Sequence, residues 1–263
     1  MAPTIQHPST QRFRSVWISD IHLGSRGCQA QSLLAFLRGF ECEYLYLVGD
    51  IFDIWQLKRR IYWPQSHNDV LRTLLGKAKH GTKILYVPGN HDEYLKDFCG
   101  HEFGNIKICR QAIHQTNDGK RFLVLHGDQF DAAVLSSRLV GQLGSCAYEA
   151  LLGTNMLVNQ VRRRLGYPYW SLAGFLKHKV KNAVKFISRY EEVVAHEASR
   201  RGVDGVVCGH IHRAEITRIG DISYHNCGDW VESCTAIIEH RDGSIDLDRN
   251  NADARDKALE QAA

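Results

Sequence analysis

The stretch Val16–His22, which reads VWISDIH, decides how the rest of this chain is interpreted. It opens with a short apolar run typical of a buried strand and ends with two polar residues, Asp20 and His22. A carboxylate and an imidazole on one loop are both ligands for divalent metals. An Asp-x-His pair alone is weak evidence, because a single histidine after a strand is usually an ordinary loop residue.

Length and composition are those of an ordinary globular protein. The chain has 263 residues, of which 44% are hydrophobic and 24% charged, with a net charge of +4. No apolar run of about 18 residues occurs, and residues 1–14 lack an apolar signal core, so we expect neither a transmembrane helix nor a secretory signal. Eight cysteines form no Cys-x-x-Cys pair. We expect reduced thiols in a cytoplasmic protein, with structural zinc as the alternative.

Hydrophobic periodicity predicts an α/β fold. Helical spacing marks 31–40 and 67–79, Gly81 is a candidate C-cap, and residues 117–119 form a hairpin turn. Strands are expected at 13–19, 44–48, 83–87, 106–109, 111–116, 121–126, 205–208, 214–219, 222–226, 234–240 and 244–247. Strands alternating with helices indicate parallel pairing with crossover connections.

The same pattern predicts one domain with an insertion. The domain is expected over residues 12–248, and a long helical region interrupts it at about 132–201. Residues 1–11 and 249–263 are expected to be flexible tails, because they are polar or charged and carry no strand pattern.

Polar residues of metal-ligand type follow five of the predicted strands. They are Asp20, His22, Asp50, Asn90, His91, His126, His210 and His212. In α/β folds, sites form where strands end at their carboxyl side, so these side chains are expected to meet. Burying this many imidazoles and carboxylates without a cation would be costly. Mixed Asp, His and Asn donors suit manganese, iron or zinc rather than calcium.

One carboxylate between two sets of donors is what a two-metal centre requires. Two cations roughly 3.5–4 Å apart bind a phosphoryl oxygen and lower the pKa of a bridging water. The expected chemistry is therefore hydrolysis of a phosphate ester or anhydride by in-line attack of hydroxide.

Five motifs together match a known signature. In chain order, Asp20-x-His22, Gly49-Asp50, Gly89-Asn90-His91-Asp92, His126 and Gly209-His210-Ile211-His212 resemble the signature of the calcineurin-like metallophosphoesterases. The resemblance implies a four-layer α/β/β/α sandwich with a helical cap and two divalent metal ions. Manganese is the expected metal, with iron and zinc as alternatives.

The resemblance also implies a role for each motif residue. One metal would be held by Asp20, His22 and His212, and the other by Asn90, His126 and His210, with Asp50 bridging. His91 would face the phosphate and assist the leaving group rather than bind metal, and Asp92 would orient it.

Longer matches resemble one branch of that family. Residues 49–55 (GDIFDIW), 126–128 (HGD) and 210–213 (HIHR) resemble the branch that contains UDP-2,3-diacylglucosamine pyrophosphatase of lipid A biosynthesis. That branch implies cleavage of a UDP-linked lipid diphosphate to UMP and a lipid monophosphate, at the cytoplasmic side of the inner membrane. His91 departs from the branch, which usually has arginine there. The exact substrate therefore stays open.

Two alternative functions also remain open. One is a soluble phosphodiesterase or phosphatase acting on nucleotides or phosphoproteins, and the other is an inactive binding paralogue. The presence of every expected ligand argues against inactivity. The sequence does not indicate the oligomeric state.

Residues 156–190 concentrate the positive charge of the chain, with eight Lys or Arg and no Asp or Glu. Lys177, Lys181 and Lys185 share one face of a predicted helix whose other face is apolar. This pattern fits a cap that binds a lipid head group or a peripheral membrane surface, or an ordinary solvated face. Nucleic acid is the least favoured partner, because no recognised nucleic-acid-binding module is visible.

We expect substrate contacts from a set of aromatic, acidic and basic side chains. They are Asp53, Trp55, Arg162, Arg163, Arg164, Lys177, Lys181, Lys185 and Arg213. Asp53 has two other interpretations, as a support for the metal ligands or as the cap of the following turn.

Overall fold

Two β-sheets form the body of the protein. The structure, a computed structural model, describes residues 11–134 and 181–249, without the side chains of residues 133 and 181–185. One sheet has seven strands in the order β12-β11-β1-β2-β3-β5-β4, and the other has five in the order β6-β7-β8-β10-β9. The predicted mixed α/β fold is confirmed.

The elements have the following bounds. The seven-stranded sheet contains β1 (Gln11–Ile18), β2 (Phe40–Val48), β3 (Lys83–Val87), β4 (Glu102–Phe103), β5 (Ile106–Ile108), β11 (Ala236–Glu239) and β12 (Ile245–Asp248). The five-stranded sheet contains β6 (Ala112–Gln115), β7 (Arg121–Val124), β8 (Gly205–Cys208), β9 (Glu215–Ile219) and β10 (Ile222–Asn226). The helices are α1 (Ala30–Arg38), α2 (Ile54–Arg59), α3 (Gln65–Lys79), α4 (Asp131–Val134) and α7 (Lys181–Arg200), with 3-10 turns η1 (Glu93–Phe98) and η2 (Asp128–Phe130).

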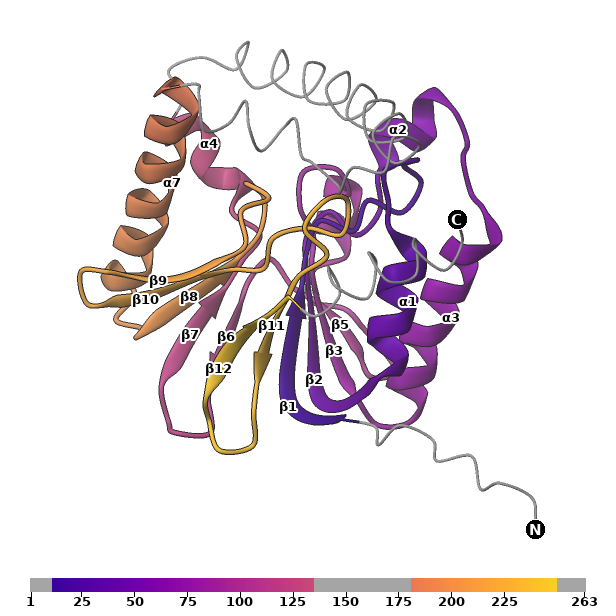
Figure 1. Ribbon diagram of the computed structural model, residues 1–263, viewed down its shortest axis with the longest axis horizontal. Coiled ribbons are helices and arrows are strands. Elements are labelled where there is room, and N and C mark those ends of the chain that lie inside the picture. Colours follow the sequence, from indigo (N-terminus) through magenta and orange to yellow (C-terminus); the bar gives the residue numbers. More distant parts are fainter. Residues whose placement is uncertain (1–10, 135–180, 250–263) are drawn as a thin grey trace, which may run out of the picture.

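The central strands of each sheet run parallel. β1, β2 and β3 pair in parallel in one sheet, and β7, β8 and β10 do so in the other. Their carboxyl ends lie at the same end of the molecule, where the long connecting loops gather (Figure 1). The fold therefore brings the polar strand ends predicted from the sequence to one place.

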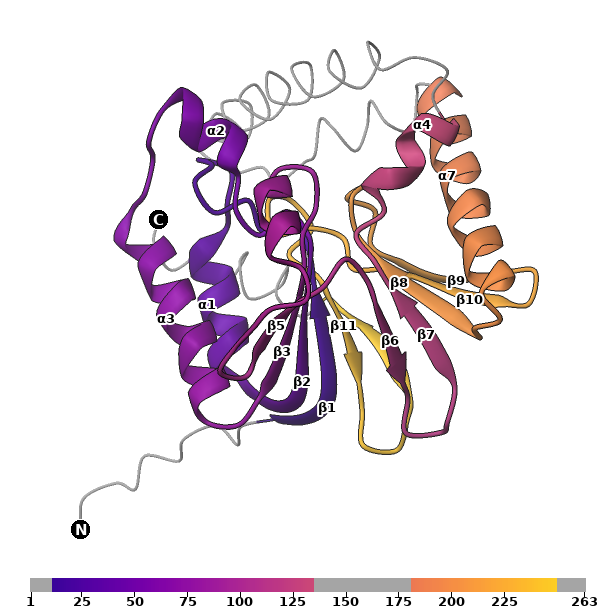
Figure 2. The same cartoon turned by 180° about the vertical axis from the view of Figure 1, so that it is seen from behind.

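Three apolar clusters hold these elements together. Leu37 of α1 belongs to the cluster between the helices α1 and α3 and the seven-stranded sheet. Val194 of α7 belongs to the cluster on the five-stranded sheet. Trp17 and Phe122 lie in the third cluster, between the sheets. Figure 2 shows α1 and α3 on one outer side of the pair of sheets and α7 on the other.

Several boundaries differ from the sequence-based expectation, and two of them lie next to each other near residue 40. The helix expected to reach residue 40 ends at Arg38, and β2 begins at Phe40 rather than residue 44. Phe40 pairs with Gln11 of β1 and packs its ring 5.8 Å from Phe13 and 4.8 Å from Phe36, between ring centroids. Its apolar side chain therefore continues the buried side of the strand rather than the helix.

The predicted insertion is described only at its two ends. Helix α4 and helix α7 lie within the expected span of 132–201, and residues 135–180 between them lie outside the described part of the chain. The predicted tails, apart from Gln11 and Arg249, lie outside it as well. The helical cap therefore stays a prediction.

The described residues include no helix long and apolar enough to cross a membrane. No disulfide joins the seven cysteines that the structure describes, which are Cys28, Cys42, Cys99, Cys109, Cys208, Cys227 and Cys234. The first four of these are half-buried and the last three are buried.

A buried polar cluster joins the two sheets around Glu239 of β11. The Glu239 carboxylate accepts hydrogen bonds from Arg14 at 2.8 Å and Ser15 at 2.7 Å, both on β1. It also lies 2.9 Å from Nε2 of His114, which belongs to β6 of the other sheet. Burial raises the pKa of Glu239, but the hydrogen bonds from His114, Ser15 and the Asn117 N–H outweigh burial and bring it to about 2.

Glu239→Gln is expected to destabilise the protein by about 2 kcal/mol at pH 7. The folded-state pKa of about 2 is below the ordinary value of 4.5, so ionisation of Glu239 favours the folded state. That contribution is complete above about pH 5 and is lost as the pH falls toward 2. Urea unfolding at pH 7 and pH 3 should show that the free energy of unfolding falls less between these two pH values in the variant than in the wild type. Glu102→Gln, at an exposed position of β4, is the matched control, and equal acid losses in wild type and Glu239→Gln would contradict the account.

Candidate metal centre

Six of the seven predicted ligands, all but Asn90, meet together with His91 in three overlapping clusters at the carboxyl ends of the strands. Within each cluster, one ligand atom from every residue lies within 4.8 Å of the others. The clusters are Asp20 with His22 and His212, Asp50 with His126 and His210, and His22 with Asp50 and His91. Asp20 and Asp50 follow strands of the seven-stranded sheet, and His126 and His210 follow strands of the five-stranded sheet. Both sheets therefore build the centre.

The ligand-bearing loops are strained. Positive φ angles between 51° and 70° occur at Asp20, His22, Asp50, His210 and His212. Among the described residues, Cys234 is the one other non-glycine residue with a positive φ. The left-handed region costs an L-residue about 1–3 kcal/mol, and such residues gather at functional sites. The strained backbone of these loops therefore indicates that the fold holds the ligand side chains in specific positions.

Hydrogen bonds fix which nitrogen of each histidine carries the proton. Nδ1 of His22 lies 3.3 Å from Oδ2 of Asp53, and Nδ1 of His126 lies 2.9 Å from the carbonyl oxygen of Val48. A carboxylate and a carbonyl only accept hydrogen bonds, so both Nδ1 atoms are donors. The Nε2 lone pairs are then left for a metal.

His210 is fixed by a residue that the sequence analysis did not identify. Its Nε2 lies 2.8 Å from Oδ1 of Asp131 on α4, so Nε2 is the donor and Nδ1 carries the lone pair. Carboxylates that orient metal-binding histidines in this way are a common feature of metal sites. Nothing near Asp131 in the sequence indicates this role.

Four buried acceptor atoms at the centre have no hydrogen-bond partner within the described structure. They are Oδ1 of Asp20, Nε2 of His22, Oδ1 of Asn90 and Nε2 of His126. Each unsatisfied buried polar group costs about 1–3 kcal/mol. All four belong to predicted ligands and all can donate an electron pair. The residues present therefore fit divalent metal ions.

The electrostatics agree with a site built for positive charge. Burial raises the pKa of Asp20, but the neighbouring His212 lowers it to about 2. Burial also raises the pKa of Asp50, and its histidine neighbours bring it well below the usual value. Burial lowers the pKa of His22, yet the hydrogen bond to Asp53 and the nearby carboxylates raise it to about 9. Ionised carboxylates thus remain buried here, balanced by positive charge on the imidazoles. A bound cation would take over that role and leave the Nε2 lone pairs of His22 and His126 free to bind it.

His91 is held in place on three sides. Its N–H donates to Oδ1 of Asp50 at 2.8 Å, and its Nδ1 lies 3.0 Å from Oδ1 of Asp53. Its ring centroid lies 4.1 Å from that of Trp55 and 4.6 Å from that of His22. Because Nδ1 donates to Asp53, Nε2 is the ring atom left to meet a substrate oxygen.

Asp53 both supports the ligands and caps a helix. Besides contacting His22 and His91, its Oδ1 accepts the N–H of Gln56 at 2.9 Å and so caps α2. Both structural interpretations of Asp53 are therefore confirmed. The predicted substrate contact stays a prediction: Asp53 is 4% exposed, and its carboxylate takes part in these hydrogen bonds.

The predicted role of Asp92 is wrong. Asp92 is fully buried, and its carboxylate accepts the N–H of Ile51 at 2.8 Å, the N–H of Gly89 at 2.6 Å and the hydroxyl of Tyr86. These bonds join the loop after β3 to the loop after β2. Asp92 positions two ligand loops, whereas Asp53 orients His91.

Two glycines allow the ligand loops to approach one another. A Cβ atom at Gly89 would lie 2.2 Å from Oδ1 of Asp50, and one at Gly209 would lie 2.4 Å from Oδ2 of Asp20. Real Cβ atoms do not come so close to other heavy atoms. The glycines of these motifs are therefore required by packing around the ligands.

Residues 13–214 match the family model described as calcineurin-like phosphoesterase. The chain belongs to this family. A UDP-2,3-diacylglucosamine hydrolase of Porphyromonas gingivalis is 30% identical over 125 residues, which cover 45% of this chain and 47% of that protein. A protein of the same name from Neisseria meningitidis serogroup B is 22% identical over 248 residues, covering 87% and 95%.

The alignments differ in extent. In three curated relatives with that name, the matched part of this calcineurin-like phosphoesterase spans about half of their length (46–48%). The solved E. coli phosphoesterase Yfce is 15% identical, with 89% of this chain and 98% of that one covered and a TM-score of 0.42.

Of the other predicted substrate contacts of this calcineurin-like phosphoesterase, the structure describes the side chains of two, Trp55 and Arg213. Trp55 is 36% exposed beside His91. Arg213 lies 3.3 Å from Glu191 and 3.0 Å from Glu215, with its guanidinium partly exposed. Contacts of both with substrate stay predictions. Arg162, Arg163, Arg164 and Lys177 lie outside the described residues, as do the side chains of Lys181 and Lys185 on α7.

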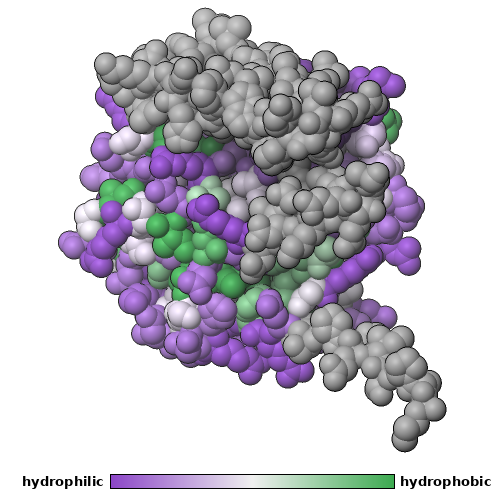
Figure 3. All heavy atoms as spheres, in the orientation of Figure 1, coloured by the Kyte–Doolittle hydropathy of each residue, from purple (hydrophilic) through white to green (hydrophobic). Residues whose placement is uncertain are grey.

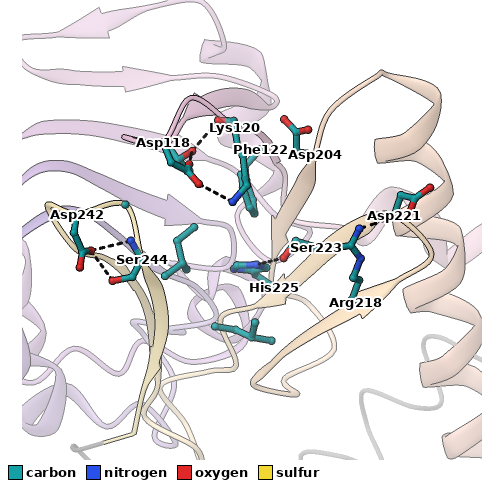
Figure 4. A pocket seen from close by; sticks show the side chains of 14 residues that line it. Asp118, Lys120, Phe122, Asp204, Arg218, Asp221, Ser223, His225, Asp242 and Ser244 are labelled. Carbon is teal, nitrogen blue, oxygen red and sulfur yellow. Dashed lines mark hydrogen bonds and ion pairs between the residues drawn. The ribbon is translucent and has the colours of Figure 1, made fainter.

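A cavity of about 520 Å³ lies away from the metal centre, where the β6–β7 hairpin and the β11–β12 hairpin approach β9 and β10. Figure 4 shows Phe122, Arg218 and His225 among its lining side chains. In Figure 3, hydrophobic residues gather on this face, near β9 and β12. The cavity contains none of the predicted ligands, so it is distinct from the candidate centre.

Proposed function

We propose that this protein hydrolyses a phosphate ester or anhydride with two divalent cations held at the candidate centre. The proposal is carried by four buried atoms of predicted ligands that make no hydrogen bond in the described structure. Two of them have only ion-pair contacts, Oδ1 of Asp20 at 3.2 Å from His212 and Nε2 of His126 at 3.3 Å from Asp50. Manganese is the proposed metal, and iron and zinc are the alternatives with similar ligand preferences.

One ion would be held by Asp20, His22 and His212. The other ion would be held by Asn90, His126 and His210, and Asp50 would contact both ions. When bound, such ions neutralise the charge of the phosphoryl oxygens and lower the pKa of a coordinated water.

His91 is positioned to protonate the leaving group. The attacking water gives one proton to solvent as its oxygen bonds to phosphorus, and the bond from phosphorus to the leaving oxygen breaks. The leaving oxygen takes the Nε2 proton of His91, which a proton from solvent then replaces. Asp53 keeps the Nδ1 proton in place, and Trp55 restricts rotation of the ring through its 4.1 Å contact. These contacts support Nε2 as the nitrogen that would deliver the proton.

The proposed substrate is a UDP-2,3-diacylglucosamine-type lipid diphosphate, cleaved to UMP and a lipid monophosphate. The name of the relatives and the GDIFDIW motif at residues 49–55 support it. We also propose peripheral attachment to the inner membrane from the cytoplasmic side through the basic segment 156–190. A soluble nucleotide phosphodiesterase is the second candidate, because His91 stands where that branch usually has arginine.

The test compares three substrates with manganese-loaded protein in mild detergent. UDP-2,3-diacylglucosamine, UDP-N-acetylglucosamine and bis-p-nitrophenyl phosphate are assayed, each with and without EDTA. We expect EDTA-sensitive turnover that is strongest for the acylated compound. Turnover of the generic ester alone would keep the metal centre and discard the lipid substrate. Turnover that survives complete metal removal would overturn the proposal.

His91→Gln is expected to lower kcat by about 10²–10⁴-fold, because the proton donor is lost. Metal content should stay that of the wild type, since the proposed ligands are untouched. The loss should be larger for diphenyl phosphate, whose phenolate leaving group is the stronger base, than for bis-p-nitrophenyl phosphate, whose nitrophenolate leaves without a proton. Kinetics with both substrates and metal analysis check this. An equal loss on both substrates would contradict leaving-group protonation.

A further inference from the structure

An exposed aromatic and basic surface extends from His91 along α2 and η1. Trp55 packs on His91, and Lys58 lies one helical turn after Trp55 on the same side of α2. The Lys58 ammonium lies 3.9 Å from the ring centroid of Tyr94 on η1 and also contacts its hydroxyl. We call Trp55, Lys58 and Tyr94 the α2 rim.

The rim is open to solvent. Trp55 is 36% exposed and Tyr94 is 48% exposed, although both are large aromatic residues. Exposed aromatic side chains beside a candidate catalytic centre suit a ligand with a flat ring, because stacking buries the ring face at little conformational cost.

The α2 side of the rim is basic, whereas η1 carries Glu93 and Asp97 beside Lys96. Residues 54–63 contain Lys58, Arg59 and Arg60 and no acidic residue. Arg26 packs on Tyr62 of the same segment, with its guanidinium carbon 4.5 Å from the ring centroid. The ligand is therefore expected to carry negative charge close to its flat ring.

We propose that the α2 rim binds the nucleoside monophosphate part of the substrate, with the base on the aromatic faces and the phosphate beside Lys58. This inference rests on the proposed function, because it takes His91 as the donor to the leaving oxygen. Trp55 lies directly against His91, so a group attached to that oxygen extends along the rim. An acyl chain would gain nothing from the cations and would need an enclosed aliphatic groove.

The test measures binding rather than turnover. UMP and ribose 5-phosphate are titrated calorimetrically into the manganese-loaded full chain. They share the phosphate and the sugar and differ by the base. We expect UMP to bind at least about tenfold more tightly, equivalent to about 1.4 kcal/mol and within the range of stacking on one aromatic residue. Trp55→Leu and Tyr94→Leu should each reduce the difference to about threefold or less and leave ribose 5-phosphate binding unchanged.

Phe103→Leu is the matched control, because Phe103 is an aromatic residue of β4 that is 59% exposed. It should keep the full preference for UMP. Equal affinity for both ligands in the wild type, or a preference that persists in both rim variants, would overturn the assignment. A third result would contradict the proposed function but not the binding assignment: the metal-loaded protein turns over no phosphodiester, while UMP still binds more tightly than ribose 5-phosphate.

Discussion

Asp50→Asn is expected to lower kcat by at least about 10²–10³-fold, with loss of bound metal. Asp50 is 2% exposed and belongs to two of the three ligand clusters. Its Oδ1 accepts the N–H of His91 at 2.8 Å, and its Oδ2 lies 3.3 Å from Nε2 of His126. Asparagine keeps the shape and can keep the first contact. It removes the charge and places an NH₂ group where the second oxygen was, so one carboxylate no longer serves both sides of the centre.

Steady-state hydrolysis of bis-p-nitrophenyl phosphate and metal analysis of the purified variant measure these two effects. Asp118→Asn is the matched control, since Asp118 lies in the exposed hairpin between β6 and β7 and contacts Lys120 rather than any proposed ligand. A variant with wild-type metal content and near wild-type turnover would rule out Asp50 as the shared ligand.

Gly89→Ala is expected to reduce kcat by at least about 10²-fold, because small displacements of catalytic groups have effects of this size. The added Cβ would lie 2.2 Å from Oδ1 of Asp50 and 2.7 Å from Nε2 of His126, so the loop must shift by an ångström or more. Overpacking of this kind should also destabilise the fold by about 1–3 kcal/mol.

Gly76→Ala provides the contrast for this substitution. A Cβ at Gly76 of α3 would meet nothing within 4 Å, so alanine should raise helix stability by about 0.5–1 kcal/mol and leave turnover unchanged. Thermal unfolding and kinetics of the two variants separate a general effect of alanine from crowding at the centre. Full activity of Gly89→Ala would show that the loop does not need this close approach.

The positions of the ligands could be predicted from the sequence because they follow strands. Asp20 comes two residues after the apolar end of β1, and His210 stands in the same relation to β8. Parallel pairing then brings such residues to one end of the fold without further information. The hairpin at residues 117–119 was equally readable, since Gly119 takes the positive φ of 87° that the turn requires.

Other features depend on packing between distant segments and leave no local pattern. Asp131 reaches His210 across 79 positions of the chain, and only the placement of α4 against α7 makes that contact possible. Asp92 follows His91 directly, yet the loop turns its side chain into the core. The carboxylate that orients His91 is therefore not the neighbouring Asp92. It is Asp53, which lies 38 positions away in the sequence.

The two sheets contribute different ligands to one centre, so the packing between the sheets sets the geometry of that centre. Trp17 and Phe122, from opposite sheets, lie in the apolar layer between them, while the ligand loops continue from the strands that carry these residues. Any sliding of one sheet over the other changes the distance between Asp50 and His126. The hydrophobic layer thus holds the ligands of the two sheets at fixed distances from one another. Substitutions that repack it are expected to lower turnover before they cause unfolding.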